Sequence, residues 1–224
     1  MRVPALCPWA DVTRVYFGPI QASHLTMDSQ GVLYGTDFAL QSAQQNVVKF
    51  DLPSQSATVV AGGFQDPVGI AFAPAGGAGA GALYVADYSA ETIDTIAPSG
   101  SVSILAGTLN QPGSLDGHFL GPEGIVVDGS GTLFVSDQGN NVIRKVMPDG
   151  SVSTIAGSAS AGYEDGKGAA ARFSDPLGIS TYLRAMRFTR FLRRELLRSL
   201  RVTLTSPGPT MESAPRLVFA YLRV

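Results

Sequence analysis

A motif of phenylalanine, proline and glycine with fixed internal spacing recurs three times in this 224-residue chain. The copies are FQDPVGIAF at 64–72, FLGPEGIVV at 119–127 and FSDPLGIS at 173–180, and they begin 55 and 54 residues apart. Self-similarity at such a period indicates a repeat architecture in which each repeat is one supersecondary unit. This repeat restricts the fold more than any other feature of the chain.

Alternating apolar runs that end in aspartate follow each of the first two copies. These runs are ALYVAD at 82–87 and TLFVSD at 132–137, and VLYGTD at 32–37 is an earlier relative. Short alternating runs between Gly, Asp and Pro turns are typical of strands. Several short strands in a unit of about 40 to 55 residues are typical of one β-propeller blade rather than a helical repeat. We therefore predict an all-β fold, since a β-sandwich would leave the self-match unexplained.

The unit at 121–150 resembles the NHL repeat. It has the pattern Pro-x-Gly-Ile-apolar-apolar-Asp, then Gly-x-Leu-Tyr/Phe-Val-x-Asp, then Asn-x-x-Ile and Gly. The preceding unit departs from this pattern, because Ala73 replaces the first aspartate and Glu91 stands where Asn141 does. The resemblance extends over about residues 20–180. It implies a β-propeller, built mostly from six four-stranded blades and used chiefly as a binding scaffold, of which this chain encodes about three and a half.

Charge divides the chain near Ser180. Residues 1–180 carry 7 basic and 16 acidic side chains, whereas residues 181–224 carry nine arginines and two glutamates. We assign 12–180 to the NHL-type propeller segment and 181–206 to an Arg-rich extension or a non-native tail. Arginines at steps of three and four predict that the extension is helical. Residues 207–224 are interpreted as a linker and terminal segment.

A partial ring leaves unpaired backbone N–H and C=O groups at both ends. The chain is therefore expected to be a fragment of a larger propeller, or to associate with another chain that completes the ring.

Nine periodic residues are interpreted as structural. An aspartate that follows a strand and precedes a tight turn can accept backbone N–H bonds and fix that turn. The glycines and prolines keep the spacing of the repeat. These positions are Asp37, Asp87, Asp137, Gly69, Gly124, Gly178, Pro67, Pro122 and Pro176.

Three acidic residues are the candidates for a ligand-binding face. Asp66, Glu123 and Asp175 flank the start of the first strand of a unit, and we expect them near the mouth of the central channel. The blade-connecting loops at 108–122 and 158–176 are expected on the same face, because such loops commonly form the ligand surface of a propeller. The predicted ligand is a protein or a small polar molecule.

Catalytic and metal chemistry find little support in the sequence. Cys7 is the single cysteine and cannot form an internal disulfide, and the two histidines cannot assemble a three-histidine zinc site. The periodic aspartates do not form the irregular, blade-specific set that a channel metal would need. We therefore predict no catalytic residue, no metal and no cofactor. The alternative function is a propeller enzyme that resembles gluconolactonases or amidating lyases and uses a channel metal.

Charge and hydropathy also bear on partners and location. The net charge of −9 in residues 1–180 argues against an RNA-binding face. No window holds eighteen uninterrupted apolar residues and the N-terminus lacks an apolar leader, so the default expectation is a soluble, cytoplasmic protein. A second alternative makes the Arg-rich tail a membrane-surface anchor, although apolar residues intrude on its Arg face. The favoured function is a noncatalytic scaffold for binding or protein interaction.

Overall fold

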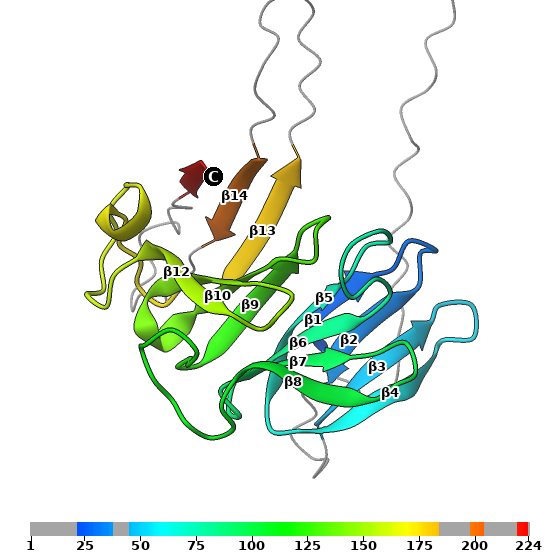
Figure 1. Cartoon of the computed structure of the whole chain (residues 1–224). Coiled ribbons are helices and arrows are strands. Elements are labelled where there is room, and N and C mark those ends of the chain that lie inside the picture. The colour runs from blue at the N-terminus through cyan, green and yellow to red at the C-terminus, as the bar shows by residue number, and fades with distance from the viewer. Residues whose placement is uncertain (1–21, 38–44, 184–197, 204–218, 224) are drawn as a thin grey trace, which may run out of the picture.

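The computed structural model describes residues 22–37, 45–183, 198–203 and 219–223, and their backbone consists mainly of short antiparallel strands (Figure 1). Three four-stranded sheets follow one another in chain order, which confirms the all-β fold class. The first sheet contains β1 (Ala22–Met27), β2 (Leu33–Asp37), β3 (Gln45–Asp51) and β4 (Ser56–Phe64). The second contains β5 (Pro67–Phe72), β6 (Leu83–Asp87), β7 (Thr92–Ile96) and β8 (Val102–Gly107). The third contains β9 (Pro122–Val127), β10 (Leu133–Asp137), β11 (Val142–Val146) and β12 (Val152–Gly157).

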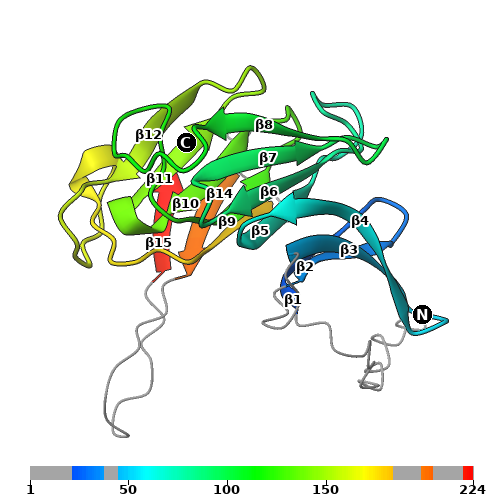
Figure 2. The same ribbon diagram turned by 90° about the horizontal axis from the view of Figure 1, so that it is seen from below.

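The first strand of each sheet lies beside the first strand of the next. β1 contacts β5, β5 contacts β9, and β9 contacts β13 (Gly178–Leu183), so these four strands form an inner row from which the sheets extend outward (Figure 2). The repeated prolines stand at the first residue of β5 and β9, the strand position at which a missing N–H is tolerated. This radial arrangement of similar sheets is that of propeller blades.

Apolar residues fill the space between successive sheets. We call the side of a sheet that faces the next sheet its forward face, and the opposite side its rear face. Val47 and Ala61 on the forward face of the first sheet pack on the rear face of the second, which presents Ile70, Leu83, Val85 and Ile96. The forward face of the second sheet packs on the rear face of the third in the same way. Each fully buried Val, Leu or Ile contributes roughly 1.5–3 kcal/mol.

Two of the periodic glycines lie where neighbouring inner strands come too close for a side chain. A Cβ on Gly69 would collide with the carbonyl oxygen of Glu123 in β9. A Cβ on Gly124 would lie 2.5 Å from the carbonyl oxygen of Leu177, at the entrance to β13. Close approach of two backbones requires the residue without a Cβ, so the glycine spacing of the sequence records where one sheet meets the next.

We call the junction between the inner strands of two neighbouring sheets a seam. Side-chain hydroxyl groups join the inner strands at two of the three seams. The Thr36 hydroxyl accepts from the His24 N–H (3.2 Å) and donates to the Val68 carbonyl of the second sheet (2.8 Å). Ser136, at the equivalent position of β10, accepts from the Gly124 N–H (2.7 Å) and donates to the Leu177 carbonyl (2.9 Å). We call these contacts hydroxyl links. Ala86 occupies this position in β6 and has no hydroxyl to offer.

The C-terminal part departs from the sequence prediction. β13, β14 (Arg198–Thr203) and β15 (Phe219–Arg223) form a three-stranded antiparallel fourth sheet. The predicted helix over 181–206 is therefore wrong at 181–183 and 198–203, while 184–197 lie outside the described residues. The physical reason is tertiary context, because β13 lies along β9 and offers β14 a strand edge, and such context overrides helix propensity.

The predicted domain limits fall partly outside the described residues, as do residues 12–21 of the propeller segment. Residues 219–223 of the terminal segment form β15. Within the described ranges, no helix has the length and apolar character needed to cross a membrane.

Candidate functional site

The carboxylates at the ends of β6 and β10 bind the connectors that enter the inner strand of their own sheet, β5 and β9 respectively. Asp87 accepts hydrogen bonds from the backbone N–H groups of Gln65 (2.8 Å), Asp66 (2.7 Å) and Ala90 (3.3 Å). Asp137 accepts one from the Leu120 N–H (2.8 Å). Both carboxylates therefore hold a blade connector and position the residues at the mouth of the inner row. Asp37 ends β2 in the same way and is also buried, but the turn after it lies outside the described residues.

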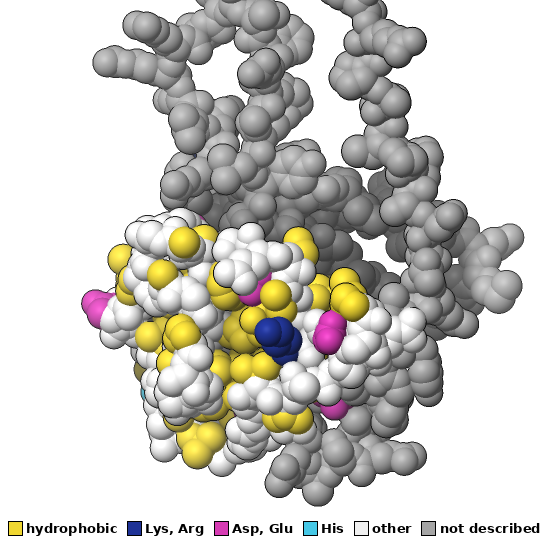
Figure 3. Space-filling view, turned by 90° about the vertical axis from the view of Figure 1, so that its right-hand side faces the viewer, with side chains coloured by type: hydrophobic (Ala, Val, Ile, Leu, Met, Phe, Trp, Pro, Cys, Tyr) yellow, Lys and Arg dark blue, Asp and Glu magenta, His cyan; other side chains and the backbone are white. Residues whose placement is uncertain are grey.

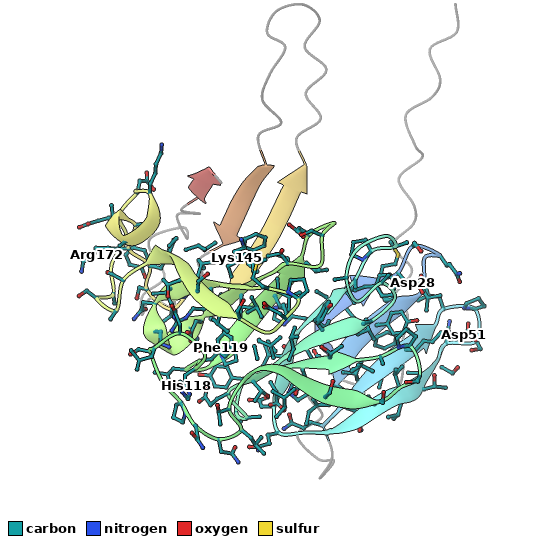
Figure 4. All side chains as sticks on the ribbon, in the orientation of Figure 1. Asp28, Asp51, His118, Phe119, Lys145 and Arg172 are labelled. Carbon is teal, nitrogen blue, oxygen red and sulfur yellow. The ribbon has the colours of Figure 1, made fainter. Side chains whose placement is uncertain are left out.

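The connector between the second and third sheets is anchored by an aromatic side chain. Phe119 is fully buried in the core between these sheets, and His118 lies next to it on the connector (Figure 4). The His118 ring lies 3.3 Å from the Gln111 carbonyl oxygen. His118 thus takes part in the loop's own structure.

Asp137 also belongs to a buried ionic network in the third sheet. Arg144 is 1% exposed, and its Nε donates to Asp137 Oδ2 at 2.8 Å. The same guanidinium donates to the Ser114 carbonyl (2.7 Å) and to Asp116 Oδ1 (3.2 Å), while Asn140 donates to Asp137 Oδ2 (2.8 Å). The arginine therefore compensates the buried carboxylate and fastens the connector 113–116 to the third sheet.

The second sheet carries a carboxylate where the third has this arginine. Asp94 pairs with Val85 in the register, as Arg144 pairs with Val135. Asp94 is 6% exposed and accepts a hydrogen bond from the Thr92 hydroxyl (3.0 Å). Burial, together with the charge of Asp87, raises the pKa of Asp94 to about 6. The second sheet is thus the more acidic of the two.

Four carboxylates act on Tyr88, the first residue after β6. The Tyr88 ring lies against Gly121, where a Cβ would come 2.7 Å from the ring. Burial is the main cause that raises the pKa of Tyr88, followed by the negative charges of four residues. These are Glu123, Glu91, Asp66 and Asp175. We call these four residues and Tyr88 the acidic mouth.

Burial and neighbouring negative charges raise the pKa values of carboxylates in the acidic mouth. Burial raises the pKa of Asp66, and the charge of Asp87 adds to the effect. Burial also raises the pKa of Glu123, and here the charge of Asp66 adds to it. Among the described residues, Asp66 Oδ1 is buried without a hydrogen-bond partner. A cationic group placed here would relieve both effects.

The three predicted ligand-face residues differ in their settings. Asp66 and Glu123 are half-buried and interact electrostatically, and Asp175 is exposed and joins them through its charge on Tyr88. Sequence reasoning missed Tyr88 and the role of Glu91. Glu91 Oε2 accepts from the Gly121 N–H at 2.6 Å, and Asn141 Oδ1, at the equivalent repeat position, accepts from the Asp175 N–H at 3.0 Å. The difference between Glu91 and Asn141 in the repeat was the available signal.

The described residues contain no group of three or more His, Cys, Asp or Glu side chains arranged to hold a metal ion. His24 lies on β1, where burial lowers its pKa. His118 lies in the connector after β8, so the two histidines belong to different parts of the molecule.

Comparison with solved structures shows a propeller-type fold. The chain is similar to an auxiliary nutrient binding protein from Bacteroides ovatus, with a TM-score of 0.57, 14% identity, and coverage of 81% of this chain and 56% of the other. It is similar to a gluconolactonase from Xanthomonas campestris, with a TM-score of 0.54, 16% identity, and coverage of 85% and 57%. For a streptogramin B lyase the TM-score is 0.53, with 15% identity and coverage of 82% and 48%.

The chain spans about half the length of the solved structures that it matches. No protein-family model matches it, and neither does any curated protein sequence. At these identities the likeness establishes the class, a protein built from propeller blades.

Proposed function

We propose that this chain is an NHL-type propeller segment that acts as a noncatalytic binding scaffold, with the acidic mouth as its ligand surface. The observation that carries the proposal is the gathering of Asp66, Glu91 and Glu123 around Tyr88, with pKa values raised by burial and by neighbouring negative charge. These carboxylates come from two successive sheets and one connector, so the site exists only in the folded chain.

The chemistry of the mouth selects a cationic partner. Desolvated carboxylates accept strong hydrogen bonds from guanidinium and ammonium groups, and the Tyr88 ring can receive a cation on its face. The ligand is therefore a protein segment that presents lysine or arginine, or a small polar molecule with an ammonium group. The net charge of −9 in residues 1–180 also favours approach of such a ligand.

A hexa-arginine peptide tests the proposal. Its Kd for the full chain is measured by calorimetry at low and moderate salt, for the wild type and for the Asp66→Asn/Glu123→Gln variant. Removing two charge-assisted contacts is expected to weaken binding about tenfold or more.

The matched control is Asp51→Asn/Asp149→Asn, which changes the net charge equally at two exposed positions outside the mouth. This control is expected to change the Kd by less than about threefold, through long-range charge alone. If both double variants weakened peptide binding equally, binding would depend on the net charge of the chain alone, which would contradict the proposed site.

A further inference from the structure

The rear face of the second sheet carries a buried carboxylate at the position where the third sheet has a buried arginine. Asp94 in β7 and Arg144 in β11 are register equivalents, because they pair with Val85 and Val135 at the same place in each sheet. Val85 belongs to the cluster that faces the first sheet, so Asp94 lies on the rear face. One position of the repeat thus holds opposite charges in successive sheets.

Arg144 shows what a charged side chain does at this position. Its guanidinium donates to Asp137 Oδ2 (2.8 Å) and Thr154 Oγ1 (2.5 Å) of its own sheet. It also donates to the Ser114 carbonyl (2.7 Å) and to Asp116 Oδ1 (3.2 Å) of the connector that precedes the sheet. In the third sheet, the position therefore binds a chain segment to the rear face through charge-assisted hydrogen bonds.

The second sheet lacks an equivalent segment. Residues 108–118 separate the end of β8 from Phe119, and they include the residues that Arg144 binds. Phe64 is the equivalent phenylalanine of the preceding connector, but it is itself the last residue of β4. The chain before β5 therefore has no counterpart of residues 113–116 with which Asp94 could interact.

Asp94 has little to compensate its charge. It is 6% exposed, and the Thr92 hydroxyl donates to its Oδ2 at 3.0 Å. Among the described residues, its other oxygen has no hydrogen-bond partner and no cation pairs with it, and the neighbouring charge that acts on it is that of Asp87. A buried carboxylate without a cation costs folding free energy. Groups kept in such a setting are candidates for a functional role.

The first two sheets do not supply the missing cation. Lys49 is the only lysine or arginine among their described residues, and its charge acts on Asp28. Figure 3 views the molecule from the side of the first sheet and shows basic side chains, in dark blue, over a small area among many hydrophobic ones. A cation for Asp94 is therefore not available from the two sheets around it.

Exposed apolar side chains border Asp94 toward the outer edge of the sheet. Ile104 of β8 pairs with Asp94 and is 50% exposed, and Val102, which pairs with Ile96, is 42% exposed. Directly paired residues lie on the same face with their Cβ atoms about 4.5–5.5 Å apart. An arginine side chain has an apolar stem and a planar charged end. The stem matches Ile104 and Val102, and the charged end matches Asp94.

We propose that Asp94 binds an arginine side chain presented by a peptide segment of another protein, which lies on the rear face of the second sheet as residues 113–116 lie on that of the third. The guanidinium donates to the Asp94 carboxylate and is attracted by the charge of Asp87. The arginine stem covers Ile104 and Val102. This site is separate from the acidic mouth and does not depend on it.

An NMR titration of the ¹⁵N-labelled full chain with the blocked peptide Ala-Ala-Arg-Ala-Ala tests the proposal. We expect shifts of the backbone amides at 92–94 and 102–106, with a Kd on the order of 1 mM for a single side chain. The same peptide with citrulline in place of arginine keeps the shape and loses the charge, so it should cause no shifts there. Shifts confined to Asp66, Tyr88 and 121–123 would overturn this site and leave the proposed function standing.

Asp94→Asn is the decisive variant, because removing an uncompensated buried charge leaves the chain at least as stable, so that unfolding cannot explain a loss of binding. It is expected to weaken peptide binding tenfold or more. Asp149→Asn is the matched control, since it removes the same charge at an exposed position, and it should change the Kd by less than about threefold. Unchanged affinity of Asp94→Asn, equal weakening by Asp149→Asn, or equal binding of the citrulline peptide would overturn the proposal.

Discussion

Replacing Asp94 by asparagine should stabilise the protein at neutral pH and leave it nearly unchanged in mild acid. Asp94 is a buried carboxylate with the charge of Asp87 nearby and one hydrogen bond from Thr92. Its pKa is about 6 in the folded chain, against 3.8 for the unperturbed group. The folded state therefore holds the Asp94 proton more tightly than the unfolded state does.

The sign and size of the effect follow from linkage. With a raised pKa, the stabilising contribution is complete below about pH 4 and is lost as the pH rises through about 6. A pKa difference of about 2 corresponds to about 3 kcal/mol. The Asp94→Asn variant cannot ionise at this position, so it escapes this loss. Its free energy of unfolding should equal that of the wild type near pH 4 and exceed it by about 3 kcal/mol at pH 7.

Urea unfolding of both proteins at pH 4, 5, 6 and 7 measures the difference. Other groups with perturbed pKa values are common to both proteins and cancel in the comparison. Asp149→Asn is the matched control, because hydrogen bonds from Ser151 lower the pKa of Asp149. Its stabilising contribution is present above the unperturbed pKa of 3.8 and is lost only at lower pH, so the difference between this variant and the wild type should stay nearly constant from pH 4 to pH 7. A difference between Asp94→Asn and wild type that is flat from pH 4 to pH 7 would refute the reasoning.

Two further predictions concern the buried ion pair of Arg144 and the binding of metal ions. Arg144→Met should lower the free energy of unfolding by about 3–5 kcal/mol, because it leaves Asp137 buried without its cation. Arg144→Met/Asp137→Asn should regain part of this loss in the same urea titration, and a double variant no more stable than the single one would argue against the ion pair. Calcium or zinc at millimolar concentration should leave the melting temperature unchanged, whereas a rise of several degrees would support the alternative of a channel-metal enzyme.

The sheets were predictable because each blade repeats the same pattern of residues at the same spacing. Gly69 and Gly124 kept their spacing because two backbones come together at the seams where they lie, and the strands ending in Asp87 and Asp137 kept theirs because each carboxylate holds a connector. The all-β fold class could therefore be read from the printed residues.

The site and the C-terminal part were less predictable, for a different reason. Tyr88 reaches the acidic mouth only because its ring lies on Gly121 of the next connector, a contact between residues 33 positions apart. Likewise, β14 is a strand because β13 offers it an edge, while its own arginine spacing favoured a helix. Both features arise from tertiary contacts that no local pattern records.

The alanine at position 86 has a mechanical consequence. Hydrogen bonds from Thr36 and Ser136 join the inner strands of the first and second sheets and of the third and fourth sheets. Ala86 offers no such bond at the middle seam, where apolar packing acts together with the bonds from Gly121 N–H to Glu91 and from Ala78 N–H to the Ser130 carbonyl. Apolar contact is non-directional and tolerates small rotations. We therefore expect the middle seam to yield to small rotations more readily than the two seams that carry a hydroxyl link. Asp66 and Glu123 lie on opposite sides of the middle seam, so a cation bound by both would restrict rotation of one sheet against the other.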